Sequence, residues 1–318
     1  MTSRRFLITG GAGFIGSNLA RALLEAGDRV RVFDDFSTGR TVNLDELDVE
    51  LVTGSLVDPE ATARAVAGCD VVFHEGAIPS VARSVAQPVA SHEANATGTL
   101  NVLLAARDAD VERVVYASSS SVYGNATVQP VHEELPTRPI SPYGVSKLVG
   151  ERYLQAFHES YGLPTVSLRY FNVFGPRQDP RAEYAAVIPR FIAATLADEP
   201  VTIFGDGEQV RDFTYVGDVV SANLLAAVAP EGAWGGAFNV AYGQRHSINE
   251  LIGAVHALIP GEHPAPVHDP PRPGDVRTSQ ADATRARELL GFEPEGSFED
   301  GLRTTVAWFA QLRDAGGL

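Results

Sequence analysis

The chain has 318 residues, which is enough for one large domain or two unequal ones. Its composition is that of an ordinary globular protein, with 44% hydrophobic and 20% charged residues. The formal net charge of −15 at pH 7 argues against nucleic acid or an anionic membrane as a partner, because both are themselves negatively charged.

The first predicted elements are a short strand, a glycine-rich turn and a helix. Arg5–Ile8 is a β-type run, Ser17–Leu24 is helix-like, and the segment Thr9–Gly16 between them reads TGGAGFIG. Glycines at 10, 13 and 16 allow a sharp turn, a close approach of backbone to a pyrophosphate and tight packing of the helix on the sheet. Free N–H groups at the helix start would attract the phosphates. This order of elements predicts a dinucleotide-binding site.

A carboxylate ends the second predicted strand. Asp34 follows Val30–Phe33, about twenty residues beyond the glycines, which is the usual distance for the acid that binds a ribose. A carboxylate there can accept both hydroxyls of the adenosine ribose and would repel a 2′-phosphate, so it favours NAD over NADP. The neighbouring Arg40 weakens that distinction, and Asp34 and Asp35 could also be ordinary turn residues.

Strands and helices alternate through the first half of the chain. Further strands are predicted at Val49–Val52, Val71–Phe73, Arg113–Ala117 and Thr165–Leu168, and helices at Pro59–Ala67, Ser91–Ala106 and Pro142–Tyr161. This alternation predicts an α/β fold with a Rossmann-type, doubly wound parallel sheet. His74 and Glu75–Ala77 close the fourth strand, at the edge where such sheets bind ligands, and we expect His74 itself to be structural.

The alternation of strands and helices becomes less regular after about Phe171, where Pro and Gly become more frequent. Two capping boxes, Ser247–Glu250 and Ser297–Asp300, predict helices that end near Ile259 and Leu312. We therefore expect an NAD-binding domain over residues 1–171. A smaller α/β substrate-binding lobe is expected over residues 172–318, with some strands returning to the main sheet.

The single cysteine and the start of the chain limit the class further. Cys69 allows neither an intrachain disulfide nor a cysteine-based metal site, and we expect it to be a small buried residue; no metal site is predicted. Only a short apolar run separates Arg4 and Arg5 from the glycines, which is too short for a signal peptide or a membrane span. The sequence therefore predicts a soluble, cytoplasmic protein.

Tyrosine, lysine and serine side chains supply candidate chemistry. Tyr143 and Lys147 are four residues apart in the predicted helix Pro142–Tyr161, so they share one face. A free tyrosine titrates near pH 10, and a neighbouring ammonium lowers its pKa toward that of a useful general base. The pair could also be an ordinary amphipathic one. The run Ser118–Ser121 follows the fifth strand at the edge that carries the glycine turn, and together these groups predict a redox site.

With these motifs the chain resembles the extended short-chain dehydrogenase/reductase superfamily, and within it the UDP-glucose/UDP-N-acetylglucosamine 4-epimerase family. The resemblance covers nearly the whole chain and rests on Thr9–Gly16, Asp34, Asn95–Thr99, Ser118–Gly124, Tyr143 with Lys147, and Arg169–Asn172. It implies that Tyr143 is the base and that Lys147 is its electrostatic partner and a ligand of the nicotinamide ribose. It also implies that Ser119, four residues before Tyr123, is the catalytic hydroxyl.

The resemblance further implies a bound NAD. The residues expected around it are Gly10, Gly13, Phe14, Ile15, Gly16, Asp34, Asp35, Phe36, Ser37, Thr38, Gly39, Ser55, Leu56, Gly76, Ala77, Asn95, Ser118, Tyr143, Lys147 and Phe171. Ser55 departs from the family, which usually carries Asp near the adenine.

A UDP-sugar site in the second lobe is implied as well. Its expected residues are Ser119, Ser121, Asn172, Val187, Thr202, Ile203, Phe204, Arg211, Arg272, Asp275 and Ser279. The two arginines would hold the diphosphate, a role suited to the guanidinium fork, although a lone arginine is more often a solvated surface charge. Asp275 would bind the nucleotide ribose. The small Ser279 would leave room for an N-acetyl group at sugar C2.

The activity implied is the NAD-dependent interconversion of UDP-glucose and UDP-galactose, extending to UDP-GlcNAc and UDP-GalNAc. A homodimer is expected through the regions Ile78–Val89 and Ser141–Tyr161. A 4,6-dehydratase would carry Asp-Glu where Ser120 and Ser121 stand, and a UDP-glucuronate 4-epimerase tends to carry Thr at the position of Asn172. A non-catalytic dinucleotide sensor is a third alternative, but such proteins often lose the Tyr or Lys that this chain keeps.

Overall fold

A seven-stranded parallel sheet forms the centre of the protein. The computed structural model describes residues 4–182, 185–271 and 277–318. The strands of the sheet lie in the order β11-β6-β5-β4-β1-β2-β3. They are β1 (Arg5–Thr9), β2 (Arg29–Asp34), β3 (Glu50–Thr53), β4 (Val71–His74), β5 (Arg113–Ser119), β6 (Thr165–Tyr170) and β11 (Gly236–Val240). The order reverses between β1 and β4, as expected for a doubly wound sheet, and the predicted fold class is confirmed.

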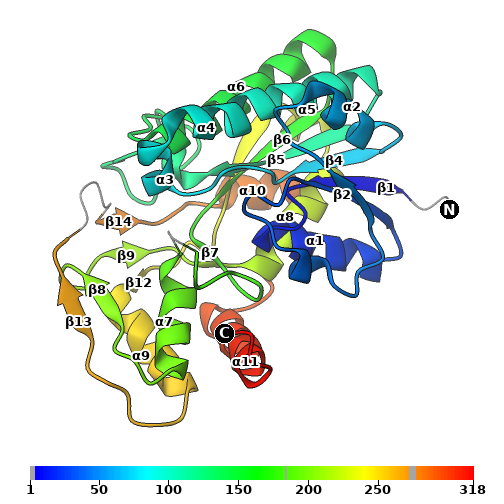
Figure 1. Cartoon of the computed structure of the whole chain (residues 1–318). Helices are drawn as coiled ribbons and strands as arrows, with labels where there is room; N and C mark the ends of the chain where they lie inside the picture. Colours follow the sequence, from blue (N-terminus) through cyan, green and yellow to red (C-terminus); the bar gives the residue numbers. More distant parts are fainter. Residues whose placement is uncertain (1–3, 183–184, 272–276) are drawn as a thin grey trace.

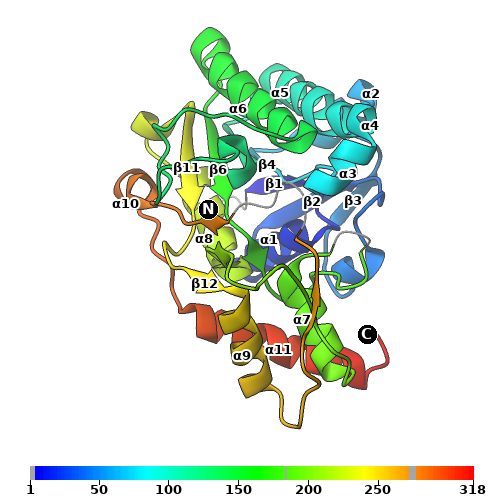
Figure 2. The same ribbon diagram turned by 90° about the vertical axis from the view of Figure 1, so that its left-hand side faces the viewer.

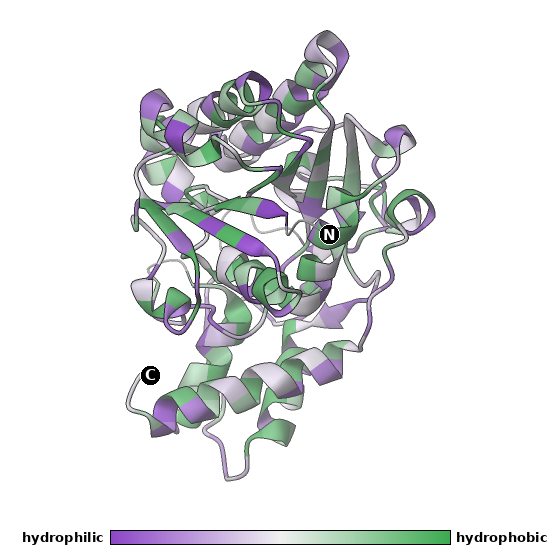
Figure 3. Cartoon of the chain, turned by 90° about the vertical axis from the view of Figure 1, so that its right-hand side faces the viewer, coloured by the Kyte–Doolittle hydropathy of each residue, from purple (hydrophilic) through white to green (hydrophobic). Residues whose placement is uncertain are grey.

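Helices cover both faces of this sheet, as Figure 1 shows. One face carries α1 (Phe14–Glu25), α8 (Val216–Ala227) and α10 (Thr284–Leu290). The other carries α2 (Pro59–Val66), α5 (Gly98–Asp108) and α6 (Pro142–Tyr161), with the short α3 (Val81–Ala86) and α4 (Pro88–His92) packed on α6. Side chains alternate along each strand, so Phe6 and Ile8 enter one core and Leu7 enters the other. Figure 3 shows the strands as largely hydrophobic.

The register of the strands brings polar groups together at the carboxyl edge of the sheet. Thr9 at the end of β1 pairs with His74 at the end of β4. Ser119 at the end of β5 pairs with Tyr170 at the end of β6. These ends face the second lobe, so this edge is the natural place for a ligand between the two parts.

The helix that carries Tyr143 and Lys147 begins and ends where the sequence predicts. Ser141 caps it by accepting a hydrogen bond from Gly144 N (3.1 Å), and Pro142 occupies its first position. Gly162 ends it in the left-handed conformation, with φ of 70°. The single helix predicted at Ser91–Ala106 was wrong in detail. In the structure this region is divided into α4, a π-helical turn at Glu93–Thr97 and α5. Such a turn often lies at a functional position.

The second lobe lies below the sheet in Figures 1 and 2. It contains α7 (Val187–Leu196), α9 (Ile248–Leu258) and α11 (Phe298–Asp314), together with β7 (Val173–Phe174), β8 (Thr202–Phe204), β9 (Val210–Arg211), β10 (Thr214–Tyr215), β12 (His246–Ser247), β13 (Val267–Asp269) and β14 (Thr278–Ser279). Its apolar core gathers around Phe174, Phe213 and Phe298. Both predicted capping boxes are present, at Ser247 and Ser297.

Two segments of the second half of the chain belong to the main sheet. After β10 the chain forms α8, which packs against α1, and then β11, which pairs in parallel with β6. Cys69 is buried, as predicted, with its sulfur 3.5 Å from Arg31 Nη1. None of the helices in the described ranges is long and apolar enough to cross a membrane.

Candidate active site

The glycine turn between β1 and α1 leaves no space for side chains. Gly10 has φ of +66°, and a Cβ on it would lie 2.6 Å from Gly76 Cα. A Cβ on Gly16 would lie 2.4 Å from the carbonyl oxygen of Gly10. Gly13 is the N-cap of α1 and makes no side-chain capping bond, so the first N–H groups of the helix remain for another acceptor. A backbone cradle at a helix N-terminus fits the diphosphate of a dinucleotide.

Asp34 stands beside this cradle with its carboxylate held in place. Oδ2 accepts a hydrogen bond from Ala12 N (2.9 Å), and Oδ1 accepts one from Phe36 N (2.8 Å). Burial raises the pKa of Asp34, while these two hydrogen bonds lower it. A Cβ on Gly39 would come within 2.8 Å of Oδ1, so a glycine is what keeps the space next to the carboxylate open. Each oxygen keeps a lone pair, which fits the two hydroxyls of a ribose.

Arg40 is the cation near Asp34 that made the sequence-based choice between NAD and NADP less clear. In the structure its guanidinium is directed toward Asp179. Its Nη1 lies 3.7 Å from Asp179 Oδ2, on the segment that follows β7. In the same segment Arg177 Nη1 donates to Asn18 Oδ1 on α1 (2.8 Å). The segment Gly175–Pro180 therefore contacts both α1 and the loop that follows β2.

Other residues expected around NAD lie along the same edge of the sheet. Several of their side chains pack against or hydrogen-bond to other parts of the protein. Leu56 fills the space over Gly76, where a Cβ would meet its Cδ1 at 2.7 Å. The Asn95 amide accepts from Ile78 N (2.7 Å) and donates to Ile78 O and to Ser146 Oγ, both at 3.1 Å. Phe171 is buried in a small apolar cluster. Ser55 lies in the loop after β3, with its Oγ 3.4 Å from Val57 N.

The candidate chemical groups converge at the end of β5 and the start of α6. Ser121 Oγ donates to Ser119 Oγ (2.9 Å), and the Ser119 hydroxyl lies close enough to the Tyr143 phenol to affect its pKa. The ammonium of Lys147 donates to Ala117 O (2.7 Å) and lies 5.9 Å from the ring centroid of Tyr143. The same ammonium lies 5.0 Å from the ring centroid of Tyr116. A phenol, a hydroxyl relay and a buried cation thus share one site.

Burial and hydrogen bonding act in opposite directions on these groups. Burial raises the pKa of Tyr143 to about 12, and the neighbouring Ser119 hydroxyl acts to lower it. Burial lowers the pKa of Lys147 to about 8, and the carboxylate of Glu75 acts to raise it. Both groups are therefore shifted by their environment, which is common at acid–base sites.

His74 has the structural role that we expected from the sequence. Its ring lies between two threonines, with Nδ1 2.7 Å from Thr9 Oγ1 and Nε2 2.9 Å from Thr99 Oγ1. Burial lowers the pKa of His74 to about 3, so the ring is neutral at physiological pH. It ties β1, β4 and α5 together beneath the site.

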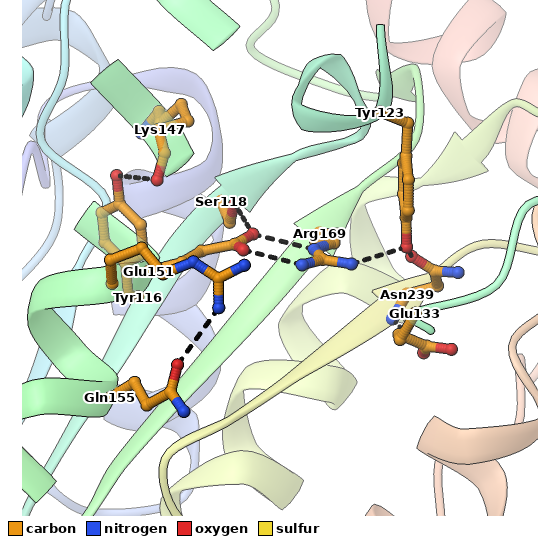
Figure 4. Close-up of polar contacts among 10 residues, drawn as sticks. Tyr116, Ser118, Tyr123, Glu133, Lys147, Glu151, Gln155, Arg169 and Asn239 are labelled. Carbon is orange, nitrogen blue, oxygen red and sulfur yellow. Dashed lines mark hydrogen bonds and ion pairs between the residues drawn. The ribbon is translucent and has the colours of Figure 1, made fainter. Parts of the chain in front are cut away.

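A buried ion pair holds α6 against the sheet (Figure 4). Arg169 on β6 makes two hydrogen bonds to Glu151 on α6, from Nε to Oε1 (2.8 Å) and from Nη2 to Oε2 (2.7 Å), and both side chains are 4% exposed. Ser118 donates its hydroxyl to the same carboxylate, so this hydroxyl points to Glu151. Arg169 Nη1 also donates to Tyr123 Oη (2.8 Å). Glu151 is four residues beyond Lys147, so the ion pair fixes the position of the turn of α6 that carries Lys147.

Several residues expected to bind the sugar nucleotide lie in the second lobe or at its junction with the sheet, and some of them are adjacent. Arg211 on β9 and Ser279 on β14 are direct partners in parallel strands. Thr202–Phe204 forms β8, and Val187 begins α7. Asn172 follows β6 and donates its amide to Asp212 O (2.9 Å). Arg272 and Asp275 lie outside the described residues.

Sequence reasoning gave no role to Glu75 or Tyr170. Tyr170 donates its hydroxyl to Glu75 Oε1 (2.9 Å), one residue beyond the end of β4. The only sequence signal was position: each residue lies at the carboxyl end of a predicted strand, Val71–Phe73 for Glu75 and Thr165–Leu168 for Tyr170. Their contact spans 95 residues of the chain, so no local pattern could have indicated it.

Comparison with known proteins gives matches over nearly the full chain. A profile of the NAD dependent epimerase/dehydratase family matches residues 6–241. The UDP-glucose 4-epimerase of Mycolicibacterium smegmatis is 42% identical over 96% of this chain and 98% of its own. A UDP-N-acetylglucosamine 4-epimerase from Methanobrevibacter ruminantium M1, solved with UDP-N-acetylmuramic acid, has a TM-score of 0.92 and 39% identity, covering 98% and 99% of the two chains. A UDP-glucose 4-epimerase from Thermus thermophilus, solved with NAD, has a TM-score of 0.87 and 39% identity, covering 96% and 99%.

Breaking the buried ion pair should destabilise the protein strongly. In Glu151→Gln the side chain keeps its shape, but the guanidinium of Arg169 loses its buried counterion. We expect the free energy of unfolding to fall by about 3 kcal/mol, measured by urea denaturation. Arg152→Gln, at the exposed neighbouring position, is the control and should change it by less than about 0.5 kcal/mol. Equal stability of the two variants would contradict a dominant role for the pair.

Proposed function

Because the chain belongs to the NAD-dependent epimerase/dehydratase family, we propose that it is a UDP-hexose 4-epimerase that interconverts UDP-glucose and UDP-galactose. The relatives similar to it over nearly their full length include UDP-sugar 4-epimerases. The observation that carries the proposal is the convergence of Tyr143, Ser119 and Lys147 beside the glycine turn.

The residues at the carboxyl edge of the sheet fit NAD. The glycine turn would receive the diphosphate, and the Asp34 carboxylate would receive the adenosine ribose. Lys147 would hold the nicotinamide ribose. When bound, NAD supplies the chemistry of a hydride acceptor and donor, so the sugar C4 can be oxidised and then reduced on its other face.

Tyr143 is proposed to move the proton of the sugar 4-hydroxyl. As a phenolate it takes this proton while C4 is oxidised, and it gives the proton back when C4 is reduced. The ammonium of Lys147 favours the phenolate by charge. Ser119 accepts a hydrogen bond from Ser121 and its hydroxyl lies near the Tyr143 phenol, so it can hold the same sugar oxygen and relay its proton.

Epimerisation requires that the oxidised sugar present both of its faces to the same hydride donor. A substrate held firmly at its nucleotide and loosely at its hexose meets this requirement. We assign the firm hold to Arg211, and to Arg272 by family resemblance, since a guanidinium can make paired hydrogen bonds to a phosphate. Val187 and Thr202–Phe204 would enclose the uracil.

The substrate range is proposed to include the N-acetylated pair, UDP-GlcNAc and UDP-GalNAc. Ser279 is a small residue placed next to Arg211 in the paired strands β14 and β9. A small side chain at this position leaves space for a substituent at sugar C2. A similar protein that covers 98% of this chain is a UDP-N-acetylglucosamine 4-epimerase.

A homodimer is proposed through the surface formed by α3, α4 and α6. Val85 on α3 is 65% exposed and Val89 on α4 is 68% exposed, and both helices pack on α6. Val145 on α6 is also exposed. Aliphatic side chains gathered on neighbouring helices are typical of a surface that a second copy covers.

Removing the phenol should stop turnover while leaving binding in place. In Tyr143→Phe we expect kcat for UDP-galactose to fall by about 10²- to 10⁴-fold, because the proton of the 4-hydroxyl loses its acceptor. UDP binding, followed by calorimetry, should remain near that of the unaltered protein. Tyr161→Phe, at the exposed end of the same helix, is the control. Near-normal turnover by Tyr143→Phe would reject the mechanism.

Enlarging Ser279 should narrow the substrate range. We expect Ser279→Tyr to lose about tenfold or more of kcat/KM for UDP-GalNAc relative to UDP-galactose, because the ring would occupy the space of the acetamido group. Ser279→Ala should keep both activities. If the unaltered protein shows no turnover of UDP-GalNAc, the wider substrate range is wrong while the UDP-galactose activity can still hold.

Charging the exposed helices should separate the subunits. The mass in solution, measured by light scattering, should be twice that of one chain. Val85→Glu should reduce it to that of one chain, because a carboxylate would be buried unpaired at the contact. Val228→Glu changes a residue of similar exposure beyond α8 and should leave the mass unchanged. A single-chain mass for the unaltered protein would remove this part of the proposal.

A further inference from the structure

Glu75 is an acid at the centre of the site to which the mechanism above gives no role. It directly follows β4, whose last residue His74 pairs with Thr9 at the end of β1. The next residue, Gly76, lies against Gly10 of the glycine turn, as the 2.6 Å approach of a Cβ built on Gly10 shows. Glu75 therefore stands where the strand order reverses, partly buried between the cofactor cradle and α6.

Its carboxylate is fixed from the side of β6 and α8. Tyr170 donates its hydroxyl to Glu75 Oε1 (2.9 Å), and Asn223 Nδ2 on α8 donates to the Tyr170 oxygen (2.8 Å). Asn223 is itself held by a hydrogen bond to Val219 O (2.8 Å). A chain of three side chains thus holds the acid in one orientation.

On the side of α6, Glu75 lies near the ammonium of Lys147, because His74 before it pairs with Tyr116 on β5 and the ammonium bonds to the carbonyl of the next residue, Ala117. The ring of Tyr143 lies 5.9 Å from the same ammonium. Lys147 is 3% exposed, and its ammonium donates a hydrogen bond to the neutral carbonyl of Ala117. Glu151, one turn further along α6, is already paired with Arg169. Among the described residues, Glu75 is the carboxylate whose charge acts on the buried ammonium.

Resting on the function proposed above, we propose that Glu75 is a positioning residue that sets the acid–base balance of Tyr143 and Lys147. Its negative charge stabilises the ammonium and opposes the phenolate. A reversible epimerase needs this balance, because Tyr143 must take a proton and return it within one turnover. A phenol made too acidic by Lys147 would be a poor proton acceptor.

The direction of each effect follows from charge. Ionised Glu75 raises the pKa of Tyr143 and also that of Lys147. Burial raises the pKa of Glu75 to about 7, with Tyr170 and Lys147 acting to lower it, so Glu75 changes charge near neutral pH. As the pH falls through this range, Glu75 becomes neutral, and Tyr143 then becomes a stronger acid.

The groups around Glu75 are few. Tyr170 faces it from β6, Tyr143 and Lys147 face it from α6, and α8 contributes the uncharged Asn223. His74, on the same strand, is held by Thr9 and Thr99 and remains neutral. The glycine turn on the side of β1 contributes no ionisable side chain.

Two substitutions separate the charge of Glu75 from its hydrogen bond. Glu75→Gln keeps the shape and removes the charge, whereas Tyr170→Phe removes the hydrogen bond and keeps the charge. The readout is the near-ultraviolet absorbance of tyrosinate, measured on the NAD-containing protein as the pH is changed. The signal of Tyr143 is isolated by subtracting the absorbance of the same variant with Tyr143→Phe added. It is recorded over the range in which circular dichroism shows the fold intact, together with the pH profile of kcat.

In Glu75→Gln the titration midpoint of Tyr143 should move down by about 0.5 to 1 pH unit. The acidic limb of the pH profile of kcat should move to lower pH with it. In Tyr170→Phe the midpoint of Tyr143 should stay in place. The inflection of kcat that belongs to Glu75 should instead move to higher pH, because the bond that lowers its pKa is lost. Glu75→Asp should restore most of the original midpoint.

An unchanged Tyr143 midpoint in Glu75→Gln, or the same shift in Glu75→Gln and Tyr170→Phe, would overturn the proposal and leave Glu75 a purely structural role. The absorbance measurement needs no substrate. If the unaltered protein fails to epimerise UDP-sugars, the proposed function fails, while the tyrosinate shift still decides whether Glu75 controls Tyr143.

Discussion

The buried ion pair between Glu151 and Arg169 is the interaction on which the geometry of the site depends. Bringing two charges out of water is costly, and the pair recovers that cost only through its two short, parallel hydrogen bonds and the added bond from Ser118. Any sliding of α6 along the sheet would break all three. Because Tyr143, Lys147 and Glu151 are spaced at four residues, fixing the last one fixes the other two. Gly150 permits this close fit, since a Cβ there would overlap the ring of Tyr116.

A second set of contacts joins the two parts of the protein around the glycine turn. The segment after β7 belongs to the second lobe in sequence, yet Arg177 bonds to Asn18 on α1 and Asp179 lies near Arg40 beyond β2. Behind it, β11 and α8 return to the main sheet. The lobe that would hold the sugar nucleotide is therefore tied to the sheet by several independent segments, and its residues keep a defined distance from the cofactor cradle.

The sequence could predict the features that depend on residues close together in the chain. The glycine turn, the cap of α6 at Ser141 and the helical spacing of Tyr143 and Lys147 are all local, and the strands alternate with helices at recognisable intervals. The π-helical turn at Glu93–Thr97 was missed because its cause is not local: the widened turn accompanies the bonds from the Asn95 amide to Ile78 and Ser146. The direction of the Ser118 hydroxyl was missed for the same reason, since Glu151 is 33 residues away.

The overall charge of the protein and the charge of its site act at different ranges. A net charge of −15 would repel an anionic sugar nucleotide, but salt at physiological strength screens exposed charges beyond about 8 Å. Buried or partly buried cations are screened much less, so Lys147 and the first N–H groups of α1 keep their effect at contact distance. The same reasoning explains why one carboxylate matters here when most of the forty acids do not. Glu75 is partly buried near the buried Lys147, so water and salt screen its charge less than that of an exposed acid, and its charge raises the pKa of both Tyr143 and Lys147.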